Sequence, residues 1–315
     1  MSLYECEKKM PPARVPLLAH ALFSMMLAGV AALILMGLVW SAGWDQGVIG
    51  GHVGPDTPQA DLWRLRFALA LNHLCVFVLA GWLALRISYR TDTLRYLRAT
   101  SAPNGEWLLW SIAMMLAAIP AVLGMLQFNQ SLPLPDTLRA MEAHTEEAVK
   151  ALLRMDGPLE LLGNLLIIAL LPAIGEELTF RGVLQRQLMR RIASPWAAIL
   201  LSAAIFSAIH LQFGGFLPRF ALGALLGWIY WRTDNFWIPV AAHFFNNGLQ
   251  IVGQYFFIKD LSAIDLEKDI AIPWHAAVLS AAAVCATGYV LAQKIRRTDS
   301  GSDRQNQSHN DIHSS

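Results

Sequence analysis

Long apolar stretches alternate with short polar ones along this chain. A helix that crosses a membrane needs about 20 mostly apolar residues, and eight stretches are candidates. The predicted spans run Val15–Trp40, Leu65–Ile87, Trp107–Phe128, Leu159 to beyond Ile174, Trp196–Leu211, Phe216–Tyr230, Phe236–Phe257 and Ile272–Ala292. The pattern therefore predicts an all-α polytopic membrane protein, a bundle of about eight transmembrane helices.

Lys and Arg residues gather after alternate spans, which predicts the orientation of the bundle. The segment 41–61, after the first span, contains no Lys or Arg. Basic residues precede the first span and follow the second, fourth and eighth spans: Lys8, Lys9, Arg14, Arg86, Arg90, Arg95, Arg98, Arg186, Arg190, Arg191, Lys294, Arg296 and Arg297. We expect both termini in the cytoplasm. The short cytoplasmic loops and the lack of a targeting extension favour a bacterial inner membrane.

The spans divide the chain into six parts. Residues 1–14 form a cytoplasmic N-terminus, and 15–130 hold the first three spans. Residues 131–157 have helical charge and apolar spacing, which is typical of an amphipathic helix on a membrane surface. Residues 158–257 form the core that carries the chemistry. A loop and the last span occupy 258–297, and the polar tail 298–315 is expected to be disordered.

Composition supports the membrane assignment and excludes some functions. Only 15% of the residues are charged and mean hydropathy is +0.43, whereas a soluble domain has about a quarter charged residues. The net charge of +1 indicates neither nucleic acid nor an acidic partner. The three cysteines are far apart and predict no disulfide framework or CxxC metal pair. The expected partners are membrane lipids and a protein or peptide substrate.

Three ionisable residues stand at the end of the fourth span, in the sequence GEELTFR. Charged groups within a span are costly, and they are functional candidates by default. Glu177 and Arg181 are four residues apart and so share one helix face; we interpret them as a buried structural pair. Glu176 is turned about 100° away on the helix, and we expect it to face a cavity.

Two further helices bring polar groups to a similar depth. His210 lies about 22 Å along its helix from Pro195, and Glu176 lies about 20 Å from Arg190. In the seventh span His243 and Asn247 are four residues apart and point the same way. His20, His73 and His275 have no partner at helical spacing, and we interpret them as packed or interfacial residues. Asn246 is expected to bond a neighbouring helix.

These residues resemble the CAAX prenyl endopeptidase and bacteriocin-processing (CPBP, or Abi) family of intramembrane proteases. The family pattern is EExxxR, then FxxxH, then HxxxN, and here it is matched by Glu176-Glu177-Leu-Thr-Phe-Arg181, Phe206-Ser-Ala-Ile-His210 and His243-Phe-Phe-Asn-Asn247. The resemblance covers roughly Leu159–Phe257. It implies a glutamate-dependent endopeptidase with its site in a cavity of the bundle.

By position, the resemblance implies that Glu176 with His210 activates water. His243 and Asn247 would stabilise the oxyanion, and Glu177, Arg181 and Phe206 would support the site. A zinc site built from Glu176, His210 and His243 is an alternative. The absence of an HExxH pair and the presence of Asn247, a poor zinc ligand but a good oxyanion donor, favour a mechanism with no metal or other cofactor.

Two other function classes remain open at this point. A membrane scaffold could keep the fold without turnover, and a proton-coupled transporter also uses carboxylates and histidines at membrane depth. The full set of Glu, His, His and Asn favours the enzyme, and a transporter would predict repeats that the sequence does not show. The substrate is expected to be a membrane-associated protein or peptide, with lipidation open.

Overall fold

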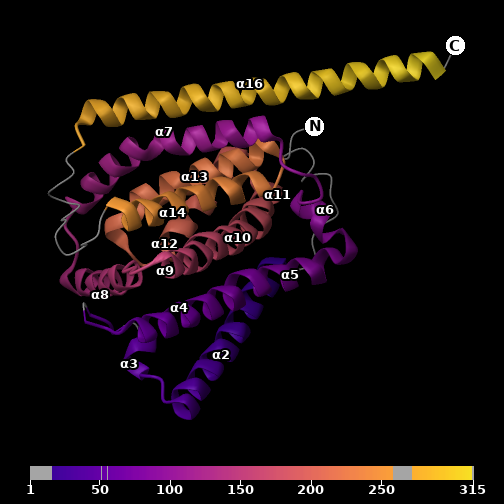
Figure 1. The fold of residues 1–315 in the computed structure, drawn as a ribbon. Helices are drawn as coiled ribbons and strands as arrows, with labels where there is room; N and C mark the ends of the chain where they lie inside the picture. The colour runs from indigo at the N-terminus through magenta and orange to yellow at the C-terminus, as the bar shows by residue number, and fades with distance from the viewer. Residues whose placement is uncertain (1–15, 51, 55, 258–271, 314–315) are drawn as a thin grey trace.

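The structure is a computed structural model that describes residues 16–50, 52–54, 56–257 and 272–313. The predicted cytoplasmic segment 1–14 and most of the loop that follows Phe257 lie outside these residues. The described part of the chain is helical and contains no β-strand, so the predicted all-α fold class is confirmed. Figure 1 shows the helices gathered into one elongated bundle.

The first part of the chain forms one side of this bundle. Helix α2 (Pro16–Ala42) packs against a long bent rod made of α4 (Gln59–His73), the π-helical segment η1 (Leu74–Leu79) and α5 (Ala80–Tyr89). Two short elements, η2 (Arg90–Asp92) and α6 (Thr93–Leu97), end the rod, and α3 (Gln46–Ile49) precedes it. These helices lie together in Figure 1, away from α16.

A second bent rod runs through the middle of the bundle. It consists of α9 (Pro158–Asn164), η3 (Leu165–Leu170), α10 (Leu171–Glu177), η4 (Leu178–Gln185) and α11 (Arg186–Arg191), where η3 and η4 are π-helical. Pro172 lies in the first turn of α10, two residues after the end of η3, and proline lacks the N–H that an α-helix interior requires. Widened turns of this kind occur frequently at functional sites, and η4 begins directly after Glu177.

Four more helices surround this central rod. Helix α12 (Pro195–Ala208) starts at a Ser194 cap with Pro195 in its first turn, as expected for a helix N-terminus. It packs on η4 and on α13 (Phe216–Thr233), and α14 (Trp237–Phe257) packs on α10 and η3. Helix α7 (Gly105–Gln130) covers α13 and α14. Residues of α10, α12 and α14 line one cavity of this bundle.

The amphipathic segment predicted over 131–157 contains a helix, α8 (Asp136–Leu152). Its C-terminal end is tied to the bundle by Arg66, a buried residue of α4. The Arg66 guanidinium donates from Nη2 to the carbonyl of Leu152 (2.8 Å) and from Nε to Oδ1 of Asn164 in α9 (2.8 Å). One buried arginine thus fixes the relative positions of α4, α8 and α9.

Within the described residues, six helical segments are long and apolar enough to cross a membrane. They are Pro16–Ala42, Gln59–Leu97, Gly105–Gln130, Pro158–Arg191, Phe213–Thr233 and Trp274–Thr298. The other two predicted spans correspond to α12, which is shorter, and to α14, which polar residues interrupt. Helix α2 exposes large apolar side chains such as Leu18, Met25 and Leu33, as expected for a helix surrounded by lipid. The chain is an integral membrane protein.

The last helix differs from its predicted length. Helix α16 runs over Trp274–His313, so it continues through the tail that was expected to be disordered from residue 298. Extending an existing helix adds one hydrogen bond for each residue that is fixed, so propagation costs far less than starting a new helix. In Figure 1, α16 lies along α7 and then projects beyond it.

Candidate active site

Glu177 and Arg181 form the ion pair that their spacing predicts. Arg181 Nε lies 3.1 Å from Glu177 Oε2, and both side chains are almost fully buried. Arg181 Nη2 also donates to the carbonyl of Gly223 in α13 (2.7 Å). A Cβ at Gly223 would lie 3.0 Å from the Phe206 ring, so glycine avoids a tight contact there. The pair therefore connects the central rod to α13.

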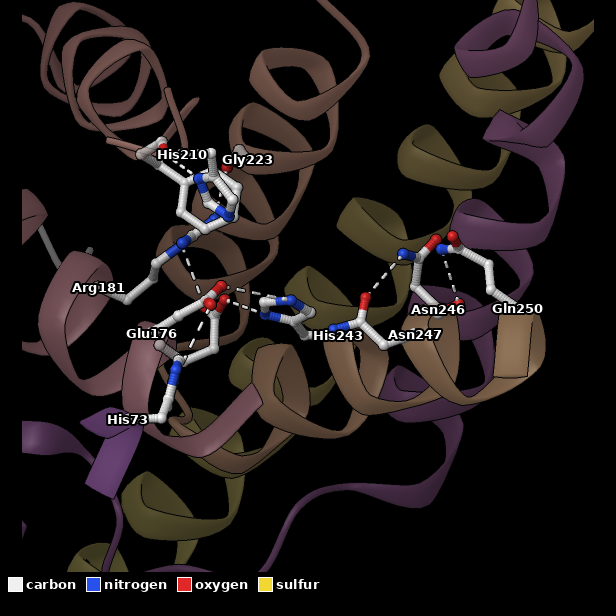
Figure 2. Close-up of polar contacts among 11 residues, drawn as sticks. His73, Glu176, Arg181, His210, Gly223, His243, Asn246, Asn247 and Gln250 are labelled. Atoms are coloured by element: carbon white, nitrogen blue, oxygen red, sulfur yellow. Dashed lines mark hydrogen bonds and ion pairs between the residues drawn. The ribbon is translucent and has the colours of Figure 1, made fainter. Parts of the chain in front are cut away.

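His243 lies beside both carboxylates. Its Nδ1 is 2.9 Å from Glu177 Oε1, and its Nε2 is 3.8 Å from Glu176 Oε2. Because an ionised carboxylate only accepts hydrogen bonds, Nδ1 carries the proton toward Glu177 and Nε2 is left to face Glu176. Figure 2 shows His243 and Arg181 pointing toward the carboxylates from different helices.

Glu176 and His243 open onto a cavity of about 650 Å³. Its polar lining residues come from α10, α12 with the turn that follows it, α13 and α14: Glu176, His210, Arg219, His243, Asn246, Asn247 and Gln250. Apolar side chains of α7, among them Met115, Ile119 and Leu123, line another wall. The cavity therefore combines a small polar cluster with apolar walls, the usual construction of a binding pocket.

His210 reaches the same cavity from the turn that ends α12. Its Nδ1 is 2.8 Å from the carbonyl oxygen of Phe206, and that oxygen only accepts, so Nδ1 donates. The other ring nitrogen, Nε2, is then an acceptor in the neutral imidazole. The ring of Phe206 packs edge-on against both His210 and His243, with centroids 5.0 Å and 6.3 Å away, and so contacts both histidines.

Asn247 and its neighbour Asn246 both line the cavity. Asn246 Nδ2 donates to Asn247 Oδ1 (3.2 Å), and Gln250 Nε2 donates to the Asn246 carbonyl (3.2 Å). Because the Asn247 oxygen is occupied by this bond, its Nδ2 donor is the group left for a ligand. Asn246 was predicted to bond a neighbouring helix; instead it orients Asn247 within α14.

Sequence reasoning also missed His73. Its Nε2 lies 4.0 Å from Glu176 Oε1, and this buried nitrogen has no hydrogen-bond partner among the described residues. The ring stacks on Phe77 with centroids 4.5 Å apart. The sequence predicts only a packing role for His73. The signal that could have identified it is its position inside a predicted span, where any ionisable residue is a functional candidate.

His20, another histidine interpreted as packing, has a polar contact of its own. Its Nε2 lies 3.1 Å from Thr179 Oγ1 in η4, and Thr179 also contacts the carbonyl of Phe77 (3.4 Å). Helix α2 is thereby linked to the π-helical turns that flank Glu176. His275 is exposed on α16, away from this network.

The zinc alternative requires Glu176, His210 and His243 to converge on one point. Among the residues that the structure describes, no group of three or more His, Cys, Asp or Glu side chains is placed to hold a metal ion. His243 and His210 each donate from Nδ1 to a protein acceptor, which leaves both Nε2 atoms available, a pattern that histidine ligands of metals also have. The feature that differs from a zinc site is therefore the position of the three side chains, which do not converge in the described structure.

Residues 158–249 match the family described as type II CAAX prenyl endopeptidase Rce1-like. The matched segment contains all three motifs, from Glu176 to Asn247, and the family predicted from those motifs is confirmed for this part of the chain. The helices from α2 to α8, with His73, precede the match, and α16 follows it.

A curated relative is the uncharacterized protein YpbD of Bacillus subtilis (strain 168). It is 35% identical over 85 residues, which are 26% of this chain and 40% of that protein. The chain thus spans less than half the length of this relative. No solved structure matches the chain.

Proposed function

We propose that this integral membrane protein, whose residues 158–249 belong to the Rce1-like CAAX prenyl endopeptidase family, is an intramembrane endopeptidase. It hydrolyses a peptide bond of a membrane-associated protein or peptide. One observation carries the proposal: Glu176, His210, His243 and Asn247 come from three separate helical segments and line one cavity. A lipid-packed scaffold gains nothing from four buried polar side chains gathered around an opening of this size.

Glu176 acts as the general base in this proposal. It is 8% exposed, and its carboxylate faces the cavity, whereas that of Glu177 is held by Arg181. A water molecule placed between Glu176 and His210 Nε2 loses a proton to Glu176 while its oxygen attacks the scissile carbonyl carbon. The same proton then passes from Glu176 to the leaving amine as the C–N bond breaks. General acid–base catalysis of this kind contributes about 10²–10⁴-fold to a rate.

Asn247 and His243 stabilise the oxyanion that forms during the attack. The hydrogen bond from Asn246 holds the Asn247 oxygen, so Asn247 Nδ2 is the donor on the cavity side. His243 already gives its Nδ1 proton to Glu177. A donor role for its Nε2 therefore calls for the doubly protonated imidazolium, which Glu176 and Glu177 flank on both sides.

The mechanism proposed here uses no metal ion. Cleavage that persists after treatment with a chelator is the expected result for such a mechanism. The apolar wall from α7 suits an apolar substrate segment or a lipid chain attached to the substrate. Lipidation of the substrate is thus compatible with the cavity and belongs to the same proposal.

The test is cleavage of a quenched-fluorescent peptide library by the purified full-length protein in detergent, compared with its Glu176→Gln variant. The wild type is expected to cleave a subset of the peptides, and the variant to lose about 10²–10⁴-fold of that activity with unchanged thermal unfolding. Glu160→Gln, a change in α9 outside the cavity lining, is the matched control and should retain activity. Full activity in Glu176→Gln would contradict Glu176 as the base. A wild type that cleaves neither these peptides nor prenylated ones would favour the scaffold.

A further inference from the structure

Arg219 lines the same cavity as Glu176 and His210, and the mechanism above does not use it. It lies in the first turn of α13, and its guanidinium packs flat on Gly215: a Cβ added there would come within 2.6 Å of Nη1. Nη1 donates to Gln212 Oε1 (3.1 Å), and Nη2 donates to the Gln212 carbonyl. The chain therefore holds this cation in a fixed place at the cavity wall.

The charge of Arg219 is not neutralised by an ion pair. Among the described residues no carboxylate oxygen lies within 4.0 Å of its nitrogens, and its buried Nε has no hydrogen-bond partner. Glu142 of α8 is close enough to attract it, but the Glu142 carboxylate accepts from the backbone N–H groups of Phe213 and Gly214 instead. A half-buried guanidinium that lines a cavity and forms no ion pair is a ready partner for an anion.

The cavity carries two charged side chains among its described lining residues, Glu176 and Arg219. A carboxylate that enters the cavity is repelled by the first and attracted by the second. An anion is therefore directed away from the carboxylate that activates water. The apolar α7 wall offers no competing polar group to such an anion.

We propose that Arg219 binds a carboxylate of the substrate and thereby sets which peptides are cleaved and where. This rests on the proposed endopeptidase function. The carboxylate comes from one of two sources, the free C-terminus of the substrate or an acidic side chain near the scissile bond. In both cases Arg219 is a substrate-binding residue that orients the peptide relative to Glu176.

A purely structural role for Arg219 predicts something different. Its bonds to Gln212 fix the turn between α12 and α13, so a structural arginine would affect every substrate equally. Loss of a structural arginine would therefore leave the preference for a carboxylate-bearing peptide unchanged. The test therefore compares matched peptides rather than total activity.

The experiment measures binding, so that it does not depend on turnover. Full-length Glu176→Gln protein in detergent is titrated into fluorescein-labelled apolar hexapeptides, and Kd is read by fluorescence anisotropy. Three peptides share one sequence core: one with a free C-terminal carboxylate, one with a C-terminal carboxamide, and one carboxamide with an internal Glu in place of Gln. Each titration is repeated with Glu176→Gln/Arg219→Gln, Glu176→Gln/Arg219→Lys and the control Glu176→Gln/Arg139→Gln, since Arg139 is an exposed residue of α8 outside the cavity.

The proposal expects a carboxylate peptide to bind about 10- to 100-fold more tightly than the uncharged carboxamide. Arg219→Gln should remove that difference and leave carboxamide binding unchanged, Arg219→Lys should keep part of it, and Arg139→Gln should keep all of it. Preference for the first or the third peptide identifies the C-terminus or the side chain as the source. Equal binding of all three peptides, no binding of any, or an equal loss for all three in Arg219→Gln would overturn the proposal.

Failure of the endopeptidase proposal is visible separately. If wild-type protein cleaves no peptide while Arg219 still confers the carboxylate preference, the result supports the binding site and contradicts the endopeptidase function. If cleavage occurs but no preference for a carboxylate is measured, the result supports the endopeptidase function and contradicts the role proposed for Arg219. Thermal unfolding of each variant confirms that the comparison is made between folded proteins.

Discussion

His73 Nε2 lies 4.0 Å from Glu176 Oε1, although α4 and α10 belong to different rods of the bundle and His73 precedes the segment that matches the protease family. The approach is close because Gly175 has no side chain: a Cβ there would come within 3.1 Å of His73 Nε2. One oxygen of Glu176 thus faces His73, and the other faces His243 at 3.8 Å.

This relationship predicts a specific kinetic effect. A distance of 4.0 Å is too long for a hydrogen bond, but catalytic contacts tighten in the substrate complex. His73→Leu removes the donor next to Glu176, and we expect kcat to fall by about tenfold or more with little change in KM. His73→Gln keeps a donor and should recover part of the loss.

Steady-state cleavage of the best library peptide measures both constants. His275→Leu, at an exposed position of α16, is the control and should behave like wild type. If His73→Leu changed KM and kcat equally, or changed nothing, the contact with Glu176 would have no catalytic role.

The Glu177–Arg181 pair predicts a stability effect as well as an activity effect. Replacing one member of a buried ion pair leaves the other charge uncompensated, at a cost of about 3–5 kcal/mol. Glu177→Ala and Arg181→Ala should therefore lower the unfolding temperature in detergent, unlike Glu176→Gln. Glu177→Ala also deprives His243 Nδ1 of its acceptor.

The double variant Glu177→Ala/Arg181→Ala should lose less unfolding free energy than the two single variants lose together, because no charge is then left without its partner. A double-mutant cycle on thermal or chemical unfolding gives this coupling. Melting curves that match wild type for either single variant would be incompatible with a structural pair.

Asn246 and Asn247 are expected to contribute to different degrees. Asn247→Ala removes an oxyanion donor and should lower kcat by about 10²–10³-fold. Asn246→Ala leaves that donor in place but releases the Asn247 oxygen that it holds, so we expect a smaller loss of about tenfold. Measured kcat values in the opposite order would mean that Asn246 supplies the donor. Unfolding temperatures near wild type for both variants would separate these effects from general destabilisation.

Helical spacing explains why part of the site was predictable. The four-residue interval between Glu177 and Arg181 predicted their ion pair. The same interval between His243 and Asn247 predicted that both side chains face the cavity. The 100° turn between adjacent residues placed Glu176 and Glu177 in different surroundings. These are local relationships, so the sequence of one helix contains them.

The features that could not be predicted depend mainly on contacts between segments that are distant in the sequence. His73 reaches Glu176 only because η1 crosses α10 at Gly175, and neither the crossing nor the π-helical turns follow from apolar spacing. The partner of Asn246 was predicted on another helix, whereas a rotamer choice placed it on the adjacent residue. Helix α16 passes residue 298 because an existing helix propagates into a polar segment that would not start one.

The crossing at Gly175 can be tested directly. In Gly175→Ala the new Cβ would lie 2.9 Å from Phe77 Cβ and 3.0 Å from Val78 Cγ2, so η1 must move away from α10. Overpacking of this kind costs about 1–3 kcal/mol. The same movement separates His73 from Glu176, so we expect lower stability together with lower kcat.

Gly253→Ala is the matched control for this substitution. Gly253 also lies in a helix, α14, but nothing lies within 4 Å of a Cβ built there. Alanine favours a helix interior over glycine by about 1 kcal/mol, so Gly253→Ala should be neutral or stabilising. Equal unfolding temperatures for the two variants would show that η1 and α10 are not in close contact.

Metal removal separates the mechanism proposed here from the zinc alternative. The described residues include no group of three or more His, Cys, Asp or Glu side chains that is placed to hold a metal ion. We therefore expect wild-type cleavage to persist after incubation with EDTA or 1,10-phenanthroline followed by desalting. Zinc content measured by mass spectrometry should be well below one ion per protein chain, with or without this treatment. Loss of cleavage that zinc restores, together with one zinc per chain that His243→Ala abolishes, would establish the metalloprotease instead and would make Glu176, His210 and His243 its ligands.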